Sequence, residues 1–129
     1  MRKAIVVDDD DLVRPTVCYM LCALGFDVTE APSGKEALRL LSASKFDLVI
    51  TDLFMPEFDG LELILGIREM ALDTPVVLMT GGGQHFPLGG EGLNDLTESA
   101  ELFGASYVLN KPFKKNDLAE IVNKALAPQ

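Results

Sequence analysis

The chain has 129 residues, 48% of them hydrophobic, and its 20 acidic and 11 basic residues give a net charge of −9. This length predicts a single domain over residues 1–129, large enough to bury a hydrophobic core. The negative charge argues against nucleic acid as a direct partner, because contact with a phosphate backbone requires a basic surface. No apolar stretch is long enough to cross a membrane and no secretory signal precedes the first apolar run, so we expect a cytoplasmic protein without membrane contacts.

Short apolar runs and helical patterns alternate along the chain. In chain order, the predicted elements are a strand at 5–7, a helix at 11–24, a strand at 26–29, a helix at 33–41, a strand at 48–51, a helix at 60–70, a strand at 76–79, a strand at 107–110 and a helix at 116–126. A capping-box spacing from Ser33 to Glu36 marks the start of the second helix. Short runs of Val, Ile and Leu between helices are typical of buried parallel strands, so the sequence predicts an α/β fold.

Reactive side chains stand at the ends of four predicted strands. Asp8 and Asp9 follow the first strand, Asp52 follows the third, Thr80 follows the fourth, and Lys111 follows the fifth. In a parallel sheet all carboxyl ends lie at one edge, and ligands bind just beyond them. We therefore expect these five side chains to meet in one place.

Three clustered carboxylates repel one another unless a cation lies between them. Hard oxygen ligands favour Mg²⁺ or Mn²⁺, and because His85 is the only histidine, a histidine-ligated metal centre is not expected. Lys111 and Thr80 on the other side would complete a cage for a phosphoryl group. One aspartate could then be the nucleophile that carries the phosphate.

Four segments carry a resemblance to a known family. They are VVDDDD at 6–11, DLVITDLFMPEFDG at 47–60, VVLMTG at 76–81 and GASYVLNKPF at 104–113. In this order they resemble the receiver domain of two-component response regulators, and the resemblance covers nearly all of the chain. It implies a flavodoxin-like (βα)5 fold, a three-layer sandwich around a five-stranded parallel sheet in the order 2-1-3-4-5.

The resemblance also implies a role for each reactive residue. Asp52 would be the phosphoacceptor, Thr80 the hydroxyl of the conformational switch, and Lys111 the family's invariant lysine, followed by a cis bond to Pro112. The Mg²⁺ (or Mn²⁺) ligands would be Asp8, Asp9, Asp52 and the backbone carbonyl of Phe54. These assignments are expectations for the structure to examine.

The function implied is that of a single-domain response regulator. A sensor histidine kinase or histidine phosphotransfer protein would phosphorylate Asp52, and binding to a downstream protein target would change in response. Such a protein is a signalling module that catalyses its own phosphorylation and dephosphorylation, rather than an enzyme, and it could be a monomer or a dimer. The alternative is a non-switching scaffold that binds other proteins. A related phosphohydrolase would need an aspartate at the position of Phe54.

The segment between Thr80 and Lys111 is longer than in a typical receiver. The two residues are 31 positions apart, and the excess falls in a glycine-rich stretch at about 81–92, before helical pattern resumes near Leu93. We predict an atypical insertion between the fourth strand and the fourth helix. A flexible surface loop is the favoured interpretation, and a lid or docking segment is the alternative. His85 lies in this stretch and is more typical of a loop surface than of a catalyst.

A second departure lies in the fifth strand. Receivers usually carry Tyr or Phe three residues before the lysine, whereas this chain has Val108 there and Tyr107 one place earlier. Adjacent strand residues face opposite sides, so Tyr107 is not a simple substitute. Two interpretations stay open: coupling between Thr80 and the output surface is weakened or rerouted, or Val108 merely packs.

Overall fold

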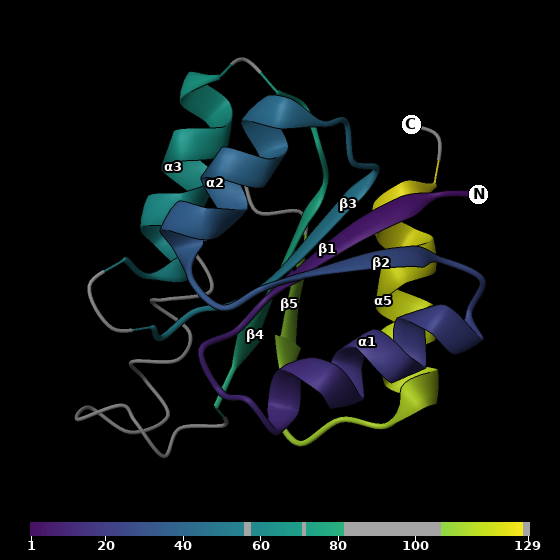
Figure 1. Ribbon diagram of the computed structural model, residues 1–129. Helices are drawn as coiled ribbons and strands as arrows, with labels where there is room; N and C mark the ends of the chain where they lie inside the picture. Colours follow the sequence, from purple (N-terminus) through teal and green to yellow (C-terminus); the bar gives the residue numbers. More distant parts are fainter. Residues whose placement is uncertain (56–57, 71, 82–106, 128–129) are drawn as a thin grey trace.

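Five parallel strands form one sheet in the order β2-β1-β3-β4-β5 (Figure 1). The computed structural model describes residues 1–55, 58–70, 72–81 and 107–127. The strands are β1 (Lys3–Val7), β2 (Asp27–Ala31), β3 (Leu48–Asp52), β4 (Val76–Thr80) and β5 (Tyr107–Asn110). The helices of the described part are α1 (Val13–Ala23), α2 (Gly34–Ala43), α3 (Gly60–Glu69) and α5 (Lys115–Leu126). The predicted flavodoxin-like fold is confirmed.

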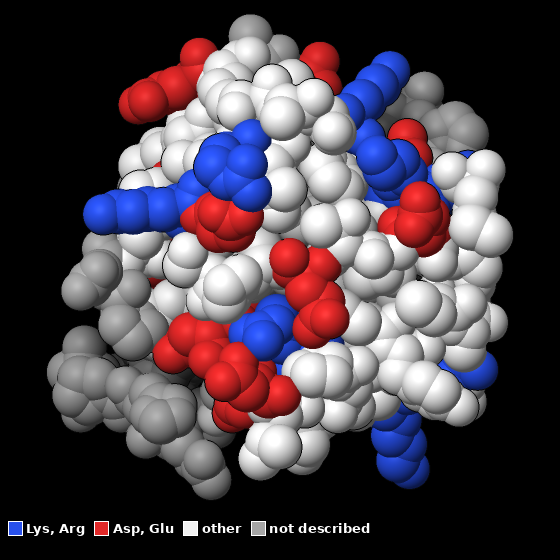
Figure 2. Space-filling view, viewed as in Figure 1, with Lys and Arg blue, Asp and Glu red and all other residues white. Residues whose placement is uncertain are grey.

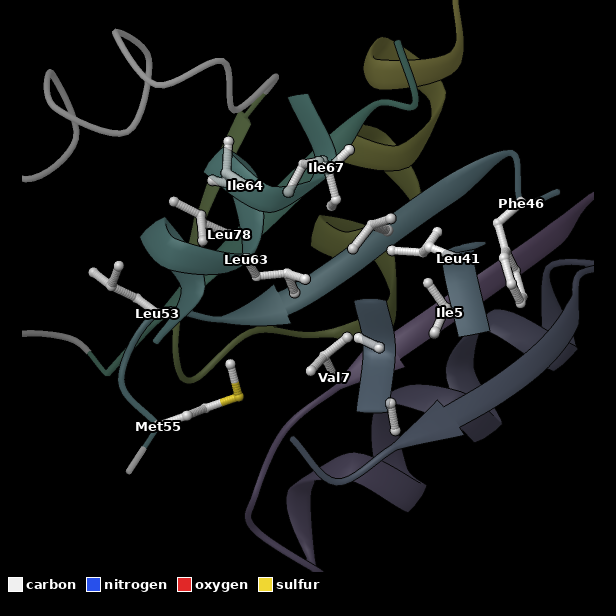
Figure 3. Close-up of a cluster of buried hydrophobic side chains, with 14 residues drawn as sticks. Ile5, Val7, Leu41, Phe46, Leu53, Met55, Leu63, Ile64, Ile67 and Leu78 are labelled. Atoms are coloured by element: carbon white, nitrogen blue, oxygen red, sulfur yellow. The ribbon is translucent and has the colours of Figure 1, made fainter. Parts of the chain in front are cut away.

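The sheet lies between two helical layers, with α2 and α3 on one face and α1 and α5 on the other (Figure 1). Every residue of the two strands β3 and β4 is buried, which explains their continuous apolar runs. Alternate strand residues pack into two separate cores. Ile5 and Val7 pack with the α2 and α3 side chains (Figure 3), and Ala4 and Val6 pack with those of α1 and α5. No helix in the described ranges has the length and apolar character needed to cross a membrane.

The ends of several elements differ from prediction for local reasons. The α1 helix starts at Val13 rather than at 11, because the Asp10 carboxylate accepts hydrogen bonds from the Leu12 and Val13 N–H groups. The β2 strand runs from Asp27 to Ala31 rather than over 26–29, and Phe26 packs in the core instead. At α1 a polar side chain thus shifts the boundary that apolar pattern alone would set.

The predicted capping box at Ser33 is only half formed. The Ser33 hydroxyl accepts a hydrogen bond from the Glu36 N–H at 3.2 Å, but the Glu36 carboxylate pairs with Arg39. A complete capping box stands instead at the start of α3, between Asp59 and Glu62. The predicted insertion at 81–92, His85 and the helical pattern from Leu93 lie outside the described residues, except for Gly81.

Candidate functional site

The carboxyl ends of β1, β3, β4 and β5 lie at one edge of the sheet because neighbouring strands pair in register. Val7 pairs with Thr51, Asp52 with Met79, and Thr80 with Asn110. Asp8 and Lys111 follow β1 and β5 directly, so all the reactive residues predicted from the sequence reach this edge. Their meeting place is a consequence of the parallel order of the strands in the sheet.

Three carboxylates gather at this edge. Asp8, Asp9 and Asp52 each offer an oxygen, and these oxygens all lie within 4.8 Å of one another. Asp8 is fully buried and Asp52 is 8% exposed, whereas Asp9 faces solvent. The donors are hard oxygens with one side open to water, which fits a divalent cation such as Mg²⁺ or Mn²⁺.

The Lys111 ammonium bridges two of these carboxylates. Its Nζ lies 3.1 Å from Asp52 Oδ1 and 3.3 Å from Asp8 Oδ2. Burial by itself would lower the pKa of Lys111, but attraction to Asp52 and Asp8 outweighs burial and raises that pKa. Lys111 is therefore expected to carry its positive charge at neutral pH. Its peptide bond to Pro112 is cis, as expected.

Asp52 is held in an environment that disfavours its charge. Burial raises its pKa to about 6, with Asp8 and Asp9 adding to the rise and Lys111 opposing it. One ammonium thus faces three carboxylates, and the excess of negative charge favours a further cation. The arrangement can hold a divalent ion and present an Asp52 oxygen beside it.

Arg14 supports the turn that carries Asp8. Sequence patterns did not reveal this contact. Its Nη1 donates to the Asp8 carbonyl at 2.7 Å, its Nη2 to Asp11 Oδ1 at 2.7 Å, and its Nε to Glu30 Oε1 at 3.2 Å. Figure 2 shows acidic side chains gathered around a basic one near the start of α1. The sequence contained one indication of the pair with Asp11: Arg14 follows Asp11 by three positions, a spacing that brings opposite charges together on a helical turn.

We expect Arg14→Met to lower the free energy of unfolding by about 1–3 kcal/mol, because it removes the hydrogen bond from the guanidinium to the Asp8 carbonyl. The Arg14 side chain is only 14% exposed, so this hydrogen bond is largely shielded from water. Arg39→Met is the matched control: Arg39 is 65% exposed and pairs with Glu36, and its loss should cost less than about 1 kcal/mol. Urea unfolding measures both, and equal losses would contradict the supporting role.

Thr80 is the last residue of β4, and its hydroxyl forms a hydrogen bond to a residue of the neighbouring strand β5. The side chain is 2% exposed, and its Oγ1 donates to Asn110 Oδ1 at 2.6 Å. The Thr80 carbonyl accepts the Lys111 N–H at 2.7 Å, which ties the two strand ends together. Asn110 was predicted only as the last residue of a strand, and its contact with Thr80 depends on the register between β4 and β5.

The aromatic position of β5 contains a packed valine. Val108 is partly buried against the core that includes Leu78, and Leu109 packs in the opposite core. Tyr107 therefore faces the side away from Val108, and it is 37% exposed. This confirms that Tyr107 does not take the place of the aromatic residue.

Gly60, the first residue of α3, lies directly against the Asp52 backbone. Its N–H donates to the Leu53 carbonyl at 2.9 Å. A Cβ at this position would lie 2.6 Å from the Asp52 carbonyl oxygen and 3.0 Å from the Leu53 Cα. The absence of a side chain therefore sets how closely α3 approaches the strand end that carries Asp52.

Comparisons with known proteins point to the same family. The response regulator receiver domain matches residues 4–123. The alkaline phosphatase synthesis transcriptional regulatory protein PhoP of Bacillus subtilis is 31% identical over 91% of this chain and 45% of its own length. The transcriptional regulatory protein PdtaR of Mycobacterium tuberculosis is 32% identical over 98% of this chain and 57% of its own. The chain thus spans about half the length of these relatives.

Solved structures of full receiver length are also similar. The chemotaxis protein CheY4 of Vibrio cholerae has a TM-score of 0.84 and 28% identity, and the match covers 98% of this chain and 99% of that one. A response regulator receiver domain protein from Clostridium thermocellum has a TM-score of 0.84 and 29% identity, covering 98% and 94%. With the family match over residues 4–123, this chain belongs to the response regulator receiver domains of two-component systems.

Proposed function

We propose that Asp52 accepts a phosphoryl group from a sensor histidine kinase or a histidine phosphotransfer protein. The observation that carries this proposal is the position of Lys111 Nζ, 3.1 Å from Asp52 and 3.3 Å from Asp8, residues that lie 59 and 103 positions away in the sequence. A charged lysine, a buried carboxylate and further acidic groups at one strand edge have the chemistry of phosphoryl transfer.

In the transfer, an Asp52 carboxylate oxygen bonds to phosphorus while the bond from phosphorus to the donor's imidazole nitrogen breaks, and its electron pair stays on that nitrogen. Lys111 donates to the oxygens of the bound group, and the Thr80 hydroxyl supplies a second donor. A divalent cation, Mg²⁺ or Mn²⁺, neutralises charge on these oxygens when bound. Its ligands would be Asp8, Asp9, Asp52 and the Phe54 carbonyl.

The phosphorylated chain would act as a single-domain switch in the cytoplasm. Replacing the Asp52 carboxylate by an acyl phosphate adds negative charge and acceptor oxygens, and this shifts an equilibrium between conformations that bind a downstream protein differently. The alternative is a non-switching scaffold. Val108 in place of the usual aromatic residue favours the scaffold, because that residue normally follows the movement of the hydroxyl.

Intact mass after incubation with acetyl phosphate and Mg²⁺ tests the proposal. We expect the gain of one phosphoryl group, its loss in Asp52→Ala, and its loss when EDTA removes the cation. Asp73→Asn is the matched control, because Asp73 is exposed and lies outside the acidic cluster. Labelling that persists in Asp52→Ala would contradict the assignment of the phosphoacceptor, and no labelling at all would favour the scaffold.

A further inference from the structure

The hydrogen bond between Thr80 and Asn110 occupies the one proton that the Thr80 hydroxyl can donate. A hydroxyl group has a single O–H donor, and here that donor is directed to Asn110 Oδ1 at 2.6 Å. The geometry is enforced by the sheet, because Thr80 and Asn110 are partners in the register of β4 and β5. In this state the hydroxyl has no proton left for an oxygen on Asp52.

The two partners of this hydrogen bond, Thr80 and Asn110, differ in how far their side chains are buried. Thr80 is 2% exposed and ends a fully buried strand, whereas Asn110 is exposed at the end of an edge strand. The Lys111 N–H holds the Thr80 carbonyl at 2.7 Å, so the backbone of both residues stays together while the side chains can separate. A rotation of the Thr80 side chain can then direct the hydroxyl proton to a different acceptor while β4 and β5 stay paired.

We propose that Asn110 is a positioning residue that holds the Thr80 hydroxyl away from Asp52 until a phosphoryl group competes for its proton. This rests on the proposed function and adds a regulator to that site. The side-chain amide of Asn110 is released when Thr80 turns to the phosphoryl oxygen, and it lies on the exposed end of β5. Coupling from the site to the surface thus runs through Asn110, at the end of the same strand whose usual aromatic position holds Val108.

Beryllofluoride, a non-covalent mimic of the phosphoryl group, provides the test. Its dissociation constant is measured by calorimetry in Mg²⁺ for the unmodified protein and for Asn110→Ala. We expect Asn110→Ala to bind about threefold to tenfold more tightly, the equivalent of one hydrogen bond between neutral groups that no longer opposes binding. Asn123→Ala, on an exposed position of α5, is the matched control and should leave the constant unchanged.

A double-mutant cycle with Thr80→Val separates the hydrogen bond from other effects of the substitution. With Val at 80 there is no hydroxyl to hold, so Asn110→Ala should change the constant by less than about twofold. Asn110→Asp keeps an acceptor and adds charge, so it should weaken binding more in the Thr80 protein than in Thr80→Val. Circular dichroism confirms that each variant is folded.

Equal effects of Asn110→Ala on both backgrounds, or weaker binding in the Thr80 protein, would overturn the role of Asn110 while leaving the proposed function intact. Failure of the unmodified protein both to bind beryllofluoride and to be labelled by acetyl phosphate would overturn the proposed function, and the role of Asn110 with it. The two failures are therefore distinguishable in one set of measurements.

Discussion

Gly60→Ala is expected to lower the free energy of unfolding by about 2–3 kcal/mol, the cost of forcing an extra methyl group into a packed site. The new Cβ would lie 2.6 Å from the Asp52 carbonyl oxygen and 2.9 Å from Leu78 Cδ2. A backbone carbonyl cannot rotate aside as a side chain can, so α3 must move away from β3. Because Asp52 ends β3, the variant should also accept phosphoryl groups from acetyl phosphate more slowly.

Gly66→Ala, in the same helix, is the control for this prediction. Its Cβ would lie 2.8 Å from Leu38 Cδ1, the end of a flexible side chain that can adjust. Alanine in a helix interior also gains roughly 0.5–1 kcal/mol over glycine, so the net change should be within about 1 kcal/mol. Urea unfolding measures both variants. A Gly60→Ala protein as stable as Gly66→Ala would show that the contact with the Asp52 carbonyl is easily relieved.

Asp52→Asn is expected to stabilise the metal-free protein at neutral pH by about 1–3 kcal/mol. Burial first, and then Asp8 and Asp9, raise the pKa of Asp52 to about 6, so its ionisation opposes folding. A rise of this size corresponds to roughly 3 kcal/mol at most, because one pH unit is about 1.4 kcal/mol. Asparagine removes the charge and keeps the shape, so this opposition disappears.

Because the pKa of Asp52 is raised in the folded protein, the stabilisation by Asp52→Asn should depend on pH. Between about pH 4 and pH 6 the folded protein holds a proton on Asp52 that the unfolded chain has lost, so stability falls as pH rises through this range. The gain from Asp52→Asn should therefore be small near pH 4 and complete above about pH 6.5. Unfolding in EDTA across this range measures it, with Asp73→Asn as the exposed control. A gain of the same size at every pH would argue against ionisation as its cause.

The parts of the site that lie on strand ends could be predicted because four of the five strands end at a reactive residue. Asp8, Asp52, Thr80 and Lys111 each follow an apolar run, and parallel strands bring their carboxyl ends together whatever their separation in sequence. The start of the α2 helix at Ser33 carried a similarly local signal. In both cases the information is contained in a few consecutive residues.

Contacts that depend on register could not be predicted in this way. Arg14 reaches Glu30 only because β2 lies beside β1, with Val6 paired to Glu30. Thr80 meets Asn110 only because β4 and β5 pair without a shift. Because β4 is apolar on both faces, its pattern does not specify its register against β5, and the same pattern gives no indication that Thr80 meets Asn110.

Because Lys111 lies far from its contacts in the sequence, the site is completed only late in the synthesis of the chain. Asp8 and Asp52 leave the ribosome well before Lys111, which lies 103 positions after Asp8. Until β5 joins the sheet, the carboxylates have no ammonium beside them and Thr80 has no Asn110. A nascent chain that already contains every aspartate of the cluster should therefore be unable to receive a signal, and competence arrives only when the last strand docks.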